Sequence, residues 1–274
     1  MHKRLAKFAL LMALFAVSRI NIRGGPAYPV VVYGDTRSNM KAHKTVLEAI
    51  CKVRPEVVFH TGDMVFNGKS KREWASVTET IAVLGDAEFY PVIGNHDRGP
   101  VFFTLFNLPN NGQWYSVDRH YTHFIVLNSN AAHDNGSEQY RWLVKDLEGI
   151  SPGIRFVVVL FHHPPFSSGE HADDEENILQ TLVPLFERYG VDLVFCGHNH
   201  AYERFYYHDI YYLITGGGGA PLYGKTTTSP YSQVYRKTYH FCGLMFIDKQ
   251  LVVDVYDPEL NRIDQIAIDG KRGI

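Results

Sequence analysis

The sequence predicts an α/β fold, in which a two-layer mixed β-sandwich is flanked by helices and the C-terminal strands are antiparallel. Three observations lead to this fold class. Short apolar runs rich in Val, Ile, Phe and Tyr recur along the chain, helix-like segments separate many of them, and aromatic-rich strands joined by turns follow residue 201. Buried strands that alternate with helices are typical of parallel β-α-β units, whereas strands joined by turns are typical of antiparallel pairing.

The apolar runs and the segments between them give the expected elements in order. We expect buried strands at residues 30–33, 57–59, 89–93, 124–127, 156–161 and 191–195. We expect helices at residues 40–53, 73–84, 138–147 and 177–188. The antiparallel strands are expected at residues 202–207, 211–215, 239–247 and 251–256. No internal repeat or Pro/Gly/Ser-rich linker divides the chain, so we expect a single domain over residues 21–274.

The N-terminal segment has the order of features that a secretory signal requires. Lys3, Arg4 and Lys7 precede an apolar run at residues 8–17. This run is too short to cross about 30 Å of hydrocarbon as a helix, and no later run is long enough. We therefore expect a signal peptide at residues 1–20 and an exported, periplasmic or extracellular protein. The alternative is a cytoplasmic protein whose amphipathic N-terminal helix packs on the domain.

Charge and cysteine content argue against a nucleic-acid-binding protein and against a cysteine-based zinc or redox site. The 27 Lys and Arg residues are balanced by 29 Asp and Glu residues, for a formal net charge of -2. A nucleic-acid-binding protein usually has a basic excess, so no nucleic-acid partner is expected. Cys51, Cys196 and Cys242 cannot all pair within one chain, and they lack the close spacing of a zinc or redox motif. We expect them to be small core residues.

Five of the predicted strands end in segments that carry metal-binding side chains, four of them after a glycine. The segments begin at Asp35, Asp63, Asn95, His162 and His198. Parallel strands bring their carboxyl ends to one edge of a sheet, where ligand sites form in open α/β structures. We therefore expect these segments to converge, although each motif alone would be an ordinary turn or a structural histidine.

The side chains in these segments are typical of a metal centre. The candidate ligands are Asp35, Asp63, Asn95, His162, His198 and His200. Oxygen and imidazole ligands without thiolates suit Mn, Fe or Zn, and six ligands exceed the three of a typical catalytic zinc site. Two divalent or trivalent ions are implied, with Asp63 as the bridging carboxylate. Such a pair activates a water molecule and stabilises the transferring phosphoryl group.

The pair His96-Asp97 follows the third strand directly. We expect Asp97 to orient the imidazole and His96 to protonate the leaving alkoxide as the general acid. The alternative is that residues 95–97 form an ordinary turn.

At this point the motifs resemble those of a known family, the calcineurin-like metallophosphoesterases, including the purple acid phosphatase branch. The motifs are Gly34-Asp35, Gly62-Asp63, Gly94-Asn95-His96-Asp97, His162-His163-Pro164-Pro165 and Gly197-His198-Asn199-His200. They occur in the family's order and spacing over residues 30–200, and residues 201–256 resemble the later strands of its fold.

The resemblance also assigns ligands to the two ions. It implies Asp35, Asp63 and His200 for the first ion, and Asp63, Asn95, His162 and His198 for the second. It makes His96 the acid. His162 is chosen over His163 because Pro164 gives it the family's His-x-Pro spacing, and His163 is then a neighbour of the site or the substrate.

Two positions depart from the family pattern. The usual Asp-x-His motif is Asp35-Thr36-Arg37 here, and the purple branch's tyrosine position is occupied by Phe66. The first ion would keep three protein ligands, and without the tyrosine ligand we expect no purple chromophore. Water, His43 or His171 could fill the vacancy. Arg37 could grip phosphate oxygens, or it could be a surface or salt-bridged arginine.

These observations favour hydrolysis of small phosphate monoesters or diesters by metal-bound hydroxide. An alternative is a catalytically weak or inactive homologue that binds one ion and a ligand. A nucleic-acid-processing enzyme is disfavoured, because no basic run accompanies the aromatic residues at 202–212.

Overall fold

The computed structural model describes residues 27–171, 176–247 and 249–272. The expected signal peptide at residues 1–20 lies outside the described residues, so export of the protein stays a prediction. In the described part of the chain, no helix has both the length and the apolar character that crossing a membrane would require.

The first sheet has six strands in the order β13-β12-β11-β1-β2-β3. Its strands are β1 (Val30–Tyr33), β2 (Val57–His60), β3 (Glu88–Pro91), β11 (Phe241–Ile247), β12 (Gln250–Tyr256) and β13 (Arg262–Asp269). Strands β1, β2 and β3 are parallel, and the C-terminal strands β11, β12 and β13 pair antiparallel beside them.

The second sheet has seven strands in the order β10-β8-β9-β7-β6-β5-β4. Its strands are β4 (Tyr115–Arg119), β5 (Thr122–Val126), β6 (Phe156–Leu160), β7 (Leu193–Cys196), β8 (Tyr202–Tyr207), β9 (Ile210–Thr215) and β10 (Ser232–Arg236). Its central strands β5, β6, β7 and β9 are parallel, whereas β4, β8 and β10 pair antiparallel with their neighbours. The mixed sandwich with antiparallel C-terminal strands is confirmed.

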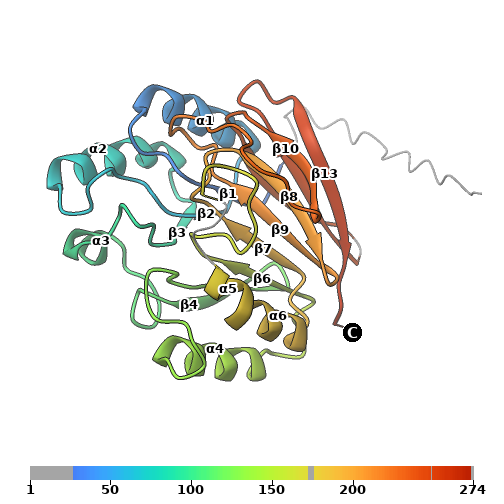
Figure 1. Ribbon diagram of the computed structural model, residues 1–274. Helices are drawn as coiled ribbons and strands as arrows, with labels where there is room; N and C mark the ends of the chain where they lie inside the picture. The colour runs from blue at the N-terminus through green and yellow to red at the C-terminus, as the bar shows by residue number, and fades with distance from the viewer. Residues whose placement is uncertain (1–26, 172–175, 248, 273–274) are drawn as a thin grey trace, which may run out of the picture.

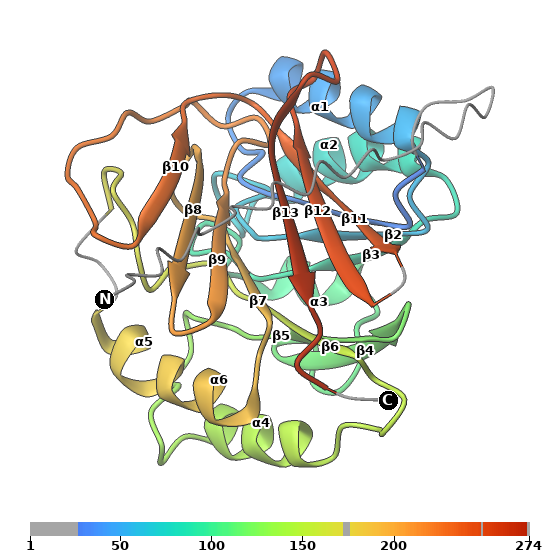
Figure 2. The ribbon, with the colours of Figure 1, turned by 90° about the vertical axis from the view of Figure 1, so that its right-hand side faces the viewer.

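The core lies between the two sheets, where apolar side chains from both inner faces pack together. Examples are Val32 and Phe59 from the first sheet and Phe124, Leu160 and Phe195 from the second. Figure 2 shows strands of both sheets, with β11, β12 and β13 beside β7, β8 and β9. Outward-facing residues of β1 and β2 pack against one helix, and those of β5, β6 and β7 pack against three others.

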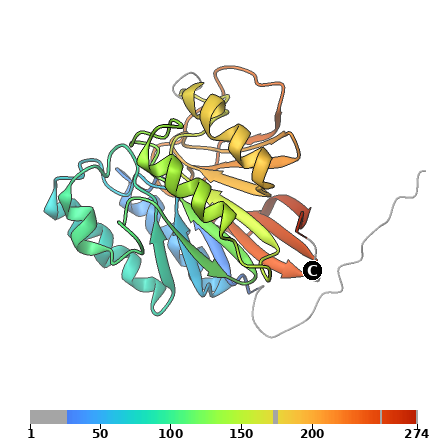
Figure 3. The same ribbon diagram turned by 90° about the horizontal axis from the view of Figure 1, so that it is seen from below.

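Helices cover the outer faces of both sheets (Figures 1 and 3). The helices are α1 (Met40–Val53), α2 (Lys71–Ile81), η1 (Ala82–Leu84), α3 (Pro100–Leu105), α4 (Glu138–Glu148), α5 (Glu176–Thr181) and α6 (Val183–Tyr189). Helix α1 packs on the first sheet, while α4, α5 and α6 pack on the second. Side chains of Asn39, Ser70 and Ser137 cap the N-termini of α1, α2 and α4 by accepting backbone N–H bonds.

The expected helix at residues 177–188 is divided into α5 and α6. Pro184 near the start of α6 has no N–H to donate to the preceding turn, so the helical ladder is interrupted there. The three cysteines are free. Cys196 and Cys242 are buried in the core as expected, whereas Cys51 is only partly buried and lies outside the core clusters of the described residues.

Candidate metal centre

The carboxyl ends of strands from both sheets meet at one edge of the sandwich. Asp35, Asp63 and Asn95 follow β1, β2 and β3, whereas His162 and His198 follow β6 and β7. The two sets are in direct contact, because the backbone N–H of His198 donates to Asp35 and the Nε2 atom of His162 lies 2.9 Å from Asn95 Oδ1. The predicted convergence therefore occurs across two sheets.

Tight backbone turns aim these side chains at one another. Asp35, Asp63 and His198 have φ angles of 57°, 57° and 71°, a left-handed conformation that is uncommon outside glycine. Bonds between the segments hold the turns, since Asp35 N donates to Gly62 O at 2.9 Å and Thr36 N donates to Asp63 O at 3.0 Å. The ligand-bearing turns therefore hold one another in place.

Two of the glycines that precede candidate ligands are required by close packing. Gly62 has a φ of 100°, and a Cβ there would lie 2.8 Å from Nδ1 of His162. A Cβ on Gly94 would lie 2.2 Å from Oδ1 of Asp63. Any side chain at either position would displace a candidate ligand.

Asp35, Asp63 and His200 form the first group of ligand atoms. One atom from each lies within 4.8 Å of the others. The Nδ1 atom of His200 donates to the carbonyl of Pro221 at 2.8 Å, so the lone pair of the neutral ring is on Nε2. This buried atom has no hydrogen-bond partner among the described residues, and it lies 3.6 Å from Asp35 Oδ1. Two acceptors that face one another leave room for a cation.

His162, His163 and His198 form the second group, with ligand atoms again within 4.8 Å of one another. The Nδ1 atom of His162 donates to the Thr61 carbonyl at 2.8 Å, which leaves the Nε2 lone pair 2.9 Å from Asn95 Oδ1 and 3.5 Å from Asp63 Oδ1. An imidazole whose second nitrogen donates to a backbone carbonyl is typical of a metal ligand.

Burial keeps the imidazoles of His162 and His200 neutral. It lowers the pKa of His162 to about 4, despite the opposing effect of Asp63. Burial likewise lowers the pKa of His200 to about 4. At neutral pH each ring therefore offers an unprotonated nitrogen, as metal binding requires.

The two buried carboxylates of the first group, Asp35 and Asp63, lie close enough together to favour a bound cation. Burial raises the pKa of Asp35 well above its ordinary value, and the nearby Asp63 raises it further. At Asp63 burial acts in the same direction, but His162, His96 and Arg37 outweigh it and lower the pKa. A bound cation would stabilise both groups in their ionised form. The donor set therefore fits metal ions.

His96 lies at the edge of this cluster, with its side chain 25% exposed. Its Nδ1 donates to the carbonyl of Phe66 at 2.8 Å, and its Nε2 lies 4.0 Å from Asp63 Oδ2. The Phe66 carbonyl thus fixes the ring and directs the other nitrogen toward the candidate ligands.

Asp97 does not orient His96, contrary to our expectation. Its two buried oxygens accept four backbone N–H groups, at distances from 2.7 to 3.2 Å. The donors are Asp63, Met64, Val65 and Gly94. The turn after Gly94 points the carboxylate of Asp97 inward, toward these N–H donors. Asp97 therefore holds the loop that carries Asp63.

Arg37 forms an ion pair with the candidate bridging carboxylate. Its Nε donates to Asp63 Oδ2 at 3.2 Å, and its side chain is 14% exposed. The guanidinium also lies over the ring of Phe66 and makes a side-chain hydrogen bond with Tyr223. The salt-bridged alternative is thus what the structure shows, and phosphate binding by Arg37 stays a proposal.

The two histidines considered as replacement ligands lie in different places. His43 is buried on α1, with its Nε2 3.3 Å from the Tyr33 hydroxyl, and it joins neither ligand group of the described residues. The ring of His171 lies 4.3 Å from that of His198 and 5.7 Å from that of Tyr223. Of the two, His171 is at the candidate centre.

Sequence reasoning missed two residues that support the ligands. Ser129 lies just past the carboxyl end of β5, and its Oγ lies 2.8 Å from Nδ1 of His163. The ring of Tyr223 stacks on His200 at 4.1 Å. The position of Ser129 after a predicted parallel strand was a usable signal, whereas Tyr223 lies in a long loop with no pattern.

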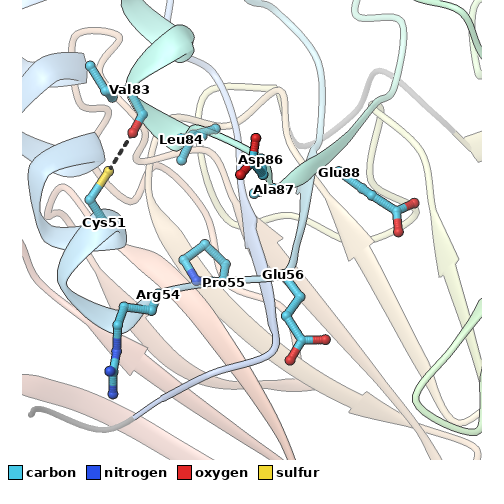
Figure 4. A pocket seen from close by; sticks show the side chains of 9 residues that line it. All are labelled: Cys51, Arg54, Pro55, Glu56, Val83, Leu84, Asp86, Ala87 and Glu88. Carbon is cyan, nitrogen blue, oxygen red and sulfur yellow. Dashed lines mark hydrogen bonds between the residues drawn. The ribbon is translucent and has the colours of Figure 1, made fainter.

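Two clefts lie elsewhere on the molecule. One, of about 550 Å³, lies among α1, η1 and the starts of β2 and β3 (Figure 4). The second, of about 680 Å³, lies between α1 and α2, and Cys51 and Val83 line both. The first cleft is at the amino ends of the parallel strands, opposite the candidate ligands, so it does not belong to the metal centre.

Comparison with known proteins agrees with this fold and places the chain in a family. Residues 28–202 match the family model of the calcineurin-like phosphoesterases, and the chain belongs to this family. It is 30% identical to purple acid phosphatase 18 of Arabidopsis thaliana over 59% of the chain and 41% of that protein. It is 29% identical to a phosphoenolpyruvate phosphatase of Allium cepa over 73% of the chain and 47% of that protein.

A solved structure confirms the fold. The purple acid phosphatase PPD1 from yellow lupin (Lupinus luteus) seeds superposes with a TM-score of 0.75 at 20% identity. The match covers 88% of this chain and 53% of that one. The chain spans less than half the length of the two plant relatives above.

Proposed function

We propose that the protein hydrolyses small phosphate esters, monoesters or diesters, at a centre of two metal ions. The observation that carries this proposal is the pair of buried ligand groups. Asp35, Asp63 and His200 form one, and His162 and His198 belong to the other. Family membership and the purple acid phosphatases among the relatives support the same reaction class.

The ligand assignment follows the contacts between these groups. Asp35, Asp63 and His200 would hold the first ion, and Asp63, Asn95, His162 and His198 the second. Mn, Fe or Zn suits this mixture of carboxylate, amide and imidazole ligands. When bound, the two ions would supply an activated water molecule and stabilise the negative charge on the phosphoryl oxygens. His163, which Ser129 holds beside His198, is a further candidate ligand of the second ion.

Residues of the chain would bind and orient the ester. Arg37 lies against Asp63 with its guanidinium partly exposed, so it could turn toward a phosphate oxygen. His96 presents Nε2 to the same carboxylate from a ring that the Phe66 carbonyl fixes. We propose that His96 enters the reaction protonated on both nitrogens and that Nε2 gives its proton to the departing alkoxide, which leaves a neutral ring with Nδ1 still donating to Phe66.

One observation favours a second candidate, a weakly active or inactive homologue that binds a single ion. The first group offers three side-chain ligands, and Arg37 already donates to one of them at 3.2 Å. A guanidinium so close to Asp63 would oppose a second positive charge. The number of bound ions separates the two candidates.

Removal of the metal tests the proposed activity. Protein loaded with Mn, Fe or Zn is expected to hydrolyse phenyl phosphate, and dialysis against a chelator is expected to abolish this activity, because the ions activate the water. Return of the ion should restore hydrolysis. Hydrolysis that continues at full rate in protein shown to be free of metal would contradict the proposal.

Replacement of His96 tests its role as the acid. In His96→Ala, kcat for an alkyl phosphate is expected to fall by about 10² to 10⁴, because that leaving group needs a proton. Hydrolysis of 4-nitrophenyl phosphate, whose leaving group is stable as an anion, should fall much less. The control is His208→Ala, a histidine in the turn between β8 and β9. Equal losses on both esters would show that His96 is not the acid.

A further inference from the structure

The ring of Phe66 lies exposed beside the candidate centre. Phe66 follows Asp63 by three residues in the loop after β2, and the residue is 60% exposed. A large apolar side chain on a surface is ordinary when it stands alone. At this position, however, it stands among the residues proposed to act on the ester.

The backbone of Phe66 is fixed on both sides. Its N–H donates to Oε2 of Glu73 at 2.8 Å, and its carbonyl accepts from Nδ1 of His96 at 2.8 Å. Glu73 in turn belongs to α2, whose first turn is capped by Ser70. The backbone from which the ring projects is therefore held at one place on the rim of the centre.

The neighbours of the ring are the proposed acid and the proposed phosphate-binding arginine. The ring centroid lies 5.2 Å from that of His96, with 38° between the planes. The guanidinium carbon of Arg37 lies 5.8 Å from the same centroid. A group that leaves next to His96 would therefore lie within reach of the Phe66 ring.

We propose that Phe66 is a specificity-determining residue that stacks on the leaving group of the substrate. The substrate class is then phosphate esters whose aromatic ring is bonded directly to the ester oxygen. An aromatic ring covers apolar surface on Phe66 and adds the favourable geometry of paired rings. A nucleoside monophosphate is a poorer fit, because its ribose separates the base from the oxygen that His96 would protonate. This inference rests on the proposed function.

The test compares two esters with leaving groups of similar acidity. The esters are phenyl phosphate and the phosphate of a fluorinated alkanol whose pKa is close to that of phenol. In Phe66→Ala, kcat/KM for phenyl phosphate is expected to fall about tenfold, whereas that for the alkyl ester should stay within about twofold. Phe66→Trp keeps a flat face and should retain the preference. Phe66→Leu, which keeps apolar volume without a ring, should lose most of it.

A matched control is Phe103→Ala, which removes another exposed phenylalanine, on α3. It should change neither value. Equal losses on both esters in Phe66→Ala would mean that the residue supports His96 or Arg37 instead, and would overturn the inference. So would an unchanged preference for the phenyl ester, or a larger loss on adenosine 5′-monophosphate than on phenyl phosphate. If the unaltered protein hydrolyses none of these esters, the proposed function itself fails.

Discussion

Asp63→Asn is expected to lower kcat/KM for phenyl phosphate by more than about a thousandfold and to reduce the bound metal. Asp63 lies in the first ligand group with Asp35 and His200, and its Oδ1 lies 3.5 Å from Nε2 of His162 in the second. It is therefore the carboxylate that we propose bridges the two ions. The amide keeps the size of the side chain but removes the charge that would bridge the ions.

The fold should tolerate this change. The oxygen of the new amide would still accept from the backbone N–H of His96, as Oδ1 of Asp63 does now at 3.0 Å. The measurements are steady-state hydrolysis and metal content per chain, with Asp134→Asn in an exposed loop as the control. A variant that keeps both ions and stays within about tenfold of the original activity would remove Asp63 from the bridging role.

Asp97→Ala is expected to destabilise the protein by roughly 4 kcal/mol, because it leaves buried backbone N–H groups without an acceptor. The carboxylate is fully buried and accepts four such groups. For a chain of this size, the loss corresponds to a decrease in Tm of about 10 °C. Thermal unfolding measures it directly, and Asp86→Ala, at an exposed turn, should have little effect.

Measuring the activity of Asp97→Ala distinguishes a supporting role of Asp97 from a catalytic one. If Asp97 acts by holding the loop of Asp63, loss of activity should accompany loss of stability and of bound metal. Asp97→Asn keeps one acceptor oxygen, so its Tm should lie between those of the unaltered protein and Asp97→Ala. A normal Tm with a large decrease in kcat would instead support the originally expected pairing with His96.

The interior strands and the edge strand β3 could be predicted from the sequence, whereas the other edge strands could not. Strands β1, β2, β5, β6 and β7 are buried along their whole length, and each contains an apolar run. Strands β4, β10 and β13 each lie at the edge of a sheet and mix polar with apolar residues. Because several residues of each of these strands meet water, its sequence has no long apolar run.

The candidate ligands could be predicted because each follows the end of a parallel strand. The supporting roles of Asp97 and Tyr223 could not be predicted from their positions in the sequence. Asp97 is next to His96 along the chain, yet its carboxylate points into the loop of Asp63. Tyr223 contacts His200 from a loop of 16 residues between β9 and β10, at 216–231. Contacts made by such a loop depend on its tertiary packing, which local patterns do not encode.

A titration of metal-free protein with Mn, Fe or Zn tests the central claim most directly. The rate of phenyl phosphate hydrolysis is measured against equivalents of ion bound per chain. If Asp63 bridges ions held by the two ligand groups, as we propose, the rate should rise until about two ions are bound and then stay constant. Saturation at one ion, or a rate that does not depend on bound metal, would contradict hydrolysis at a two-metal centre.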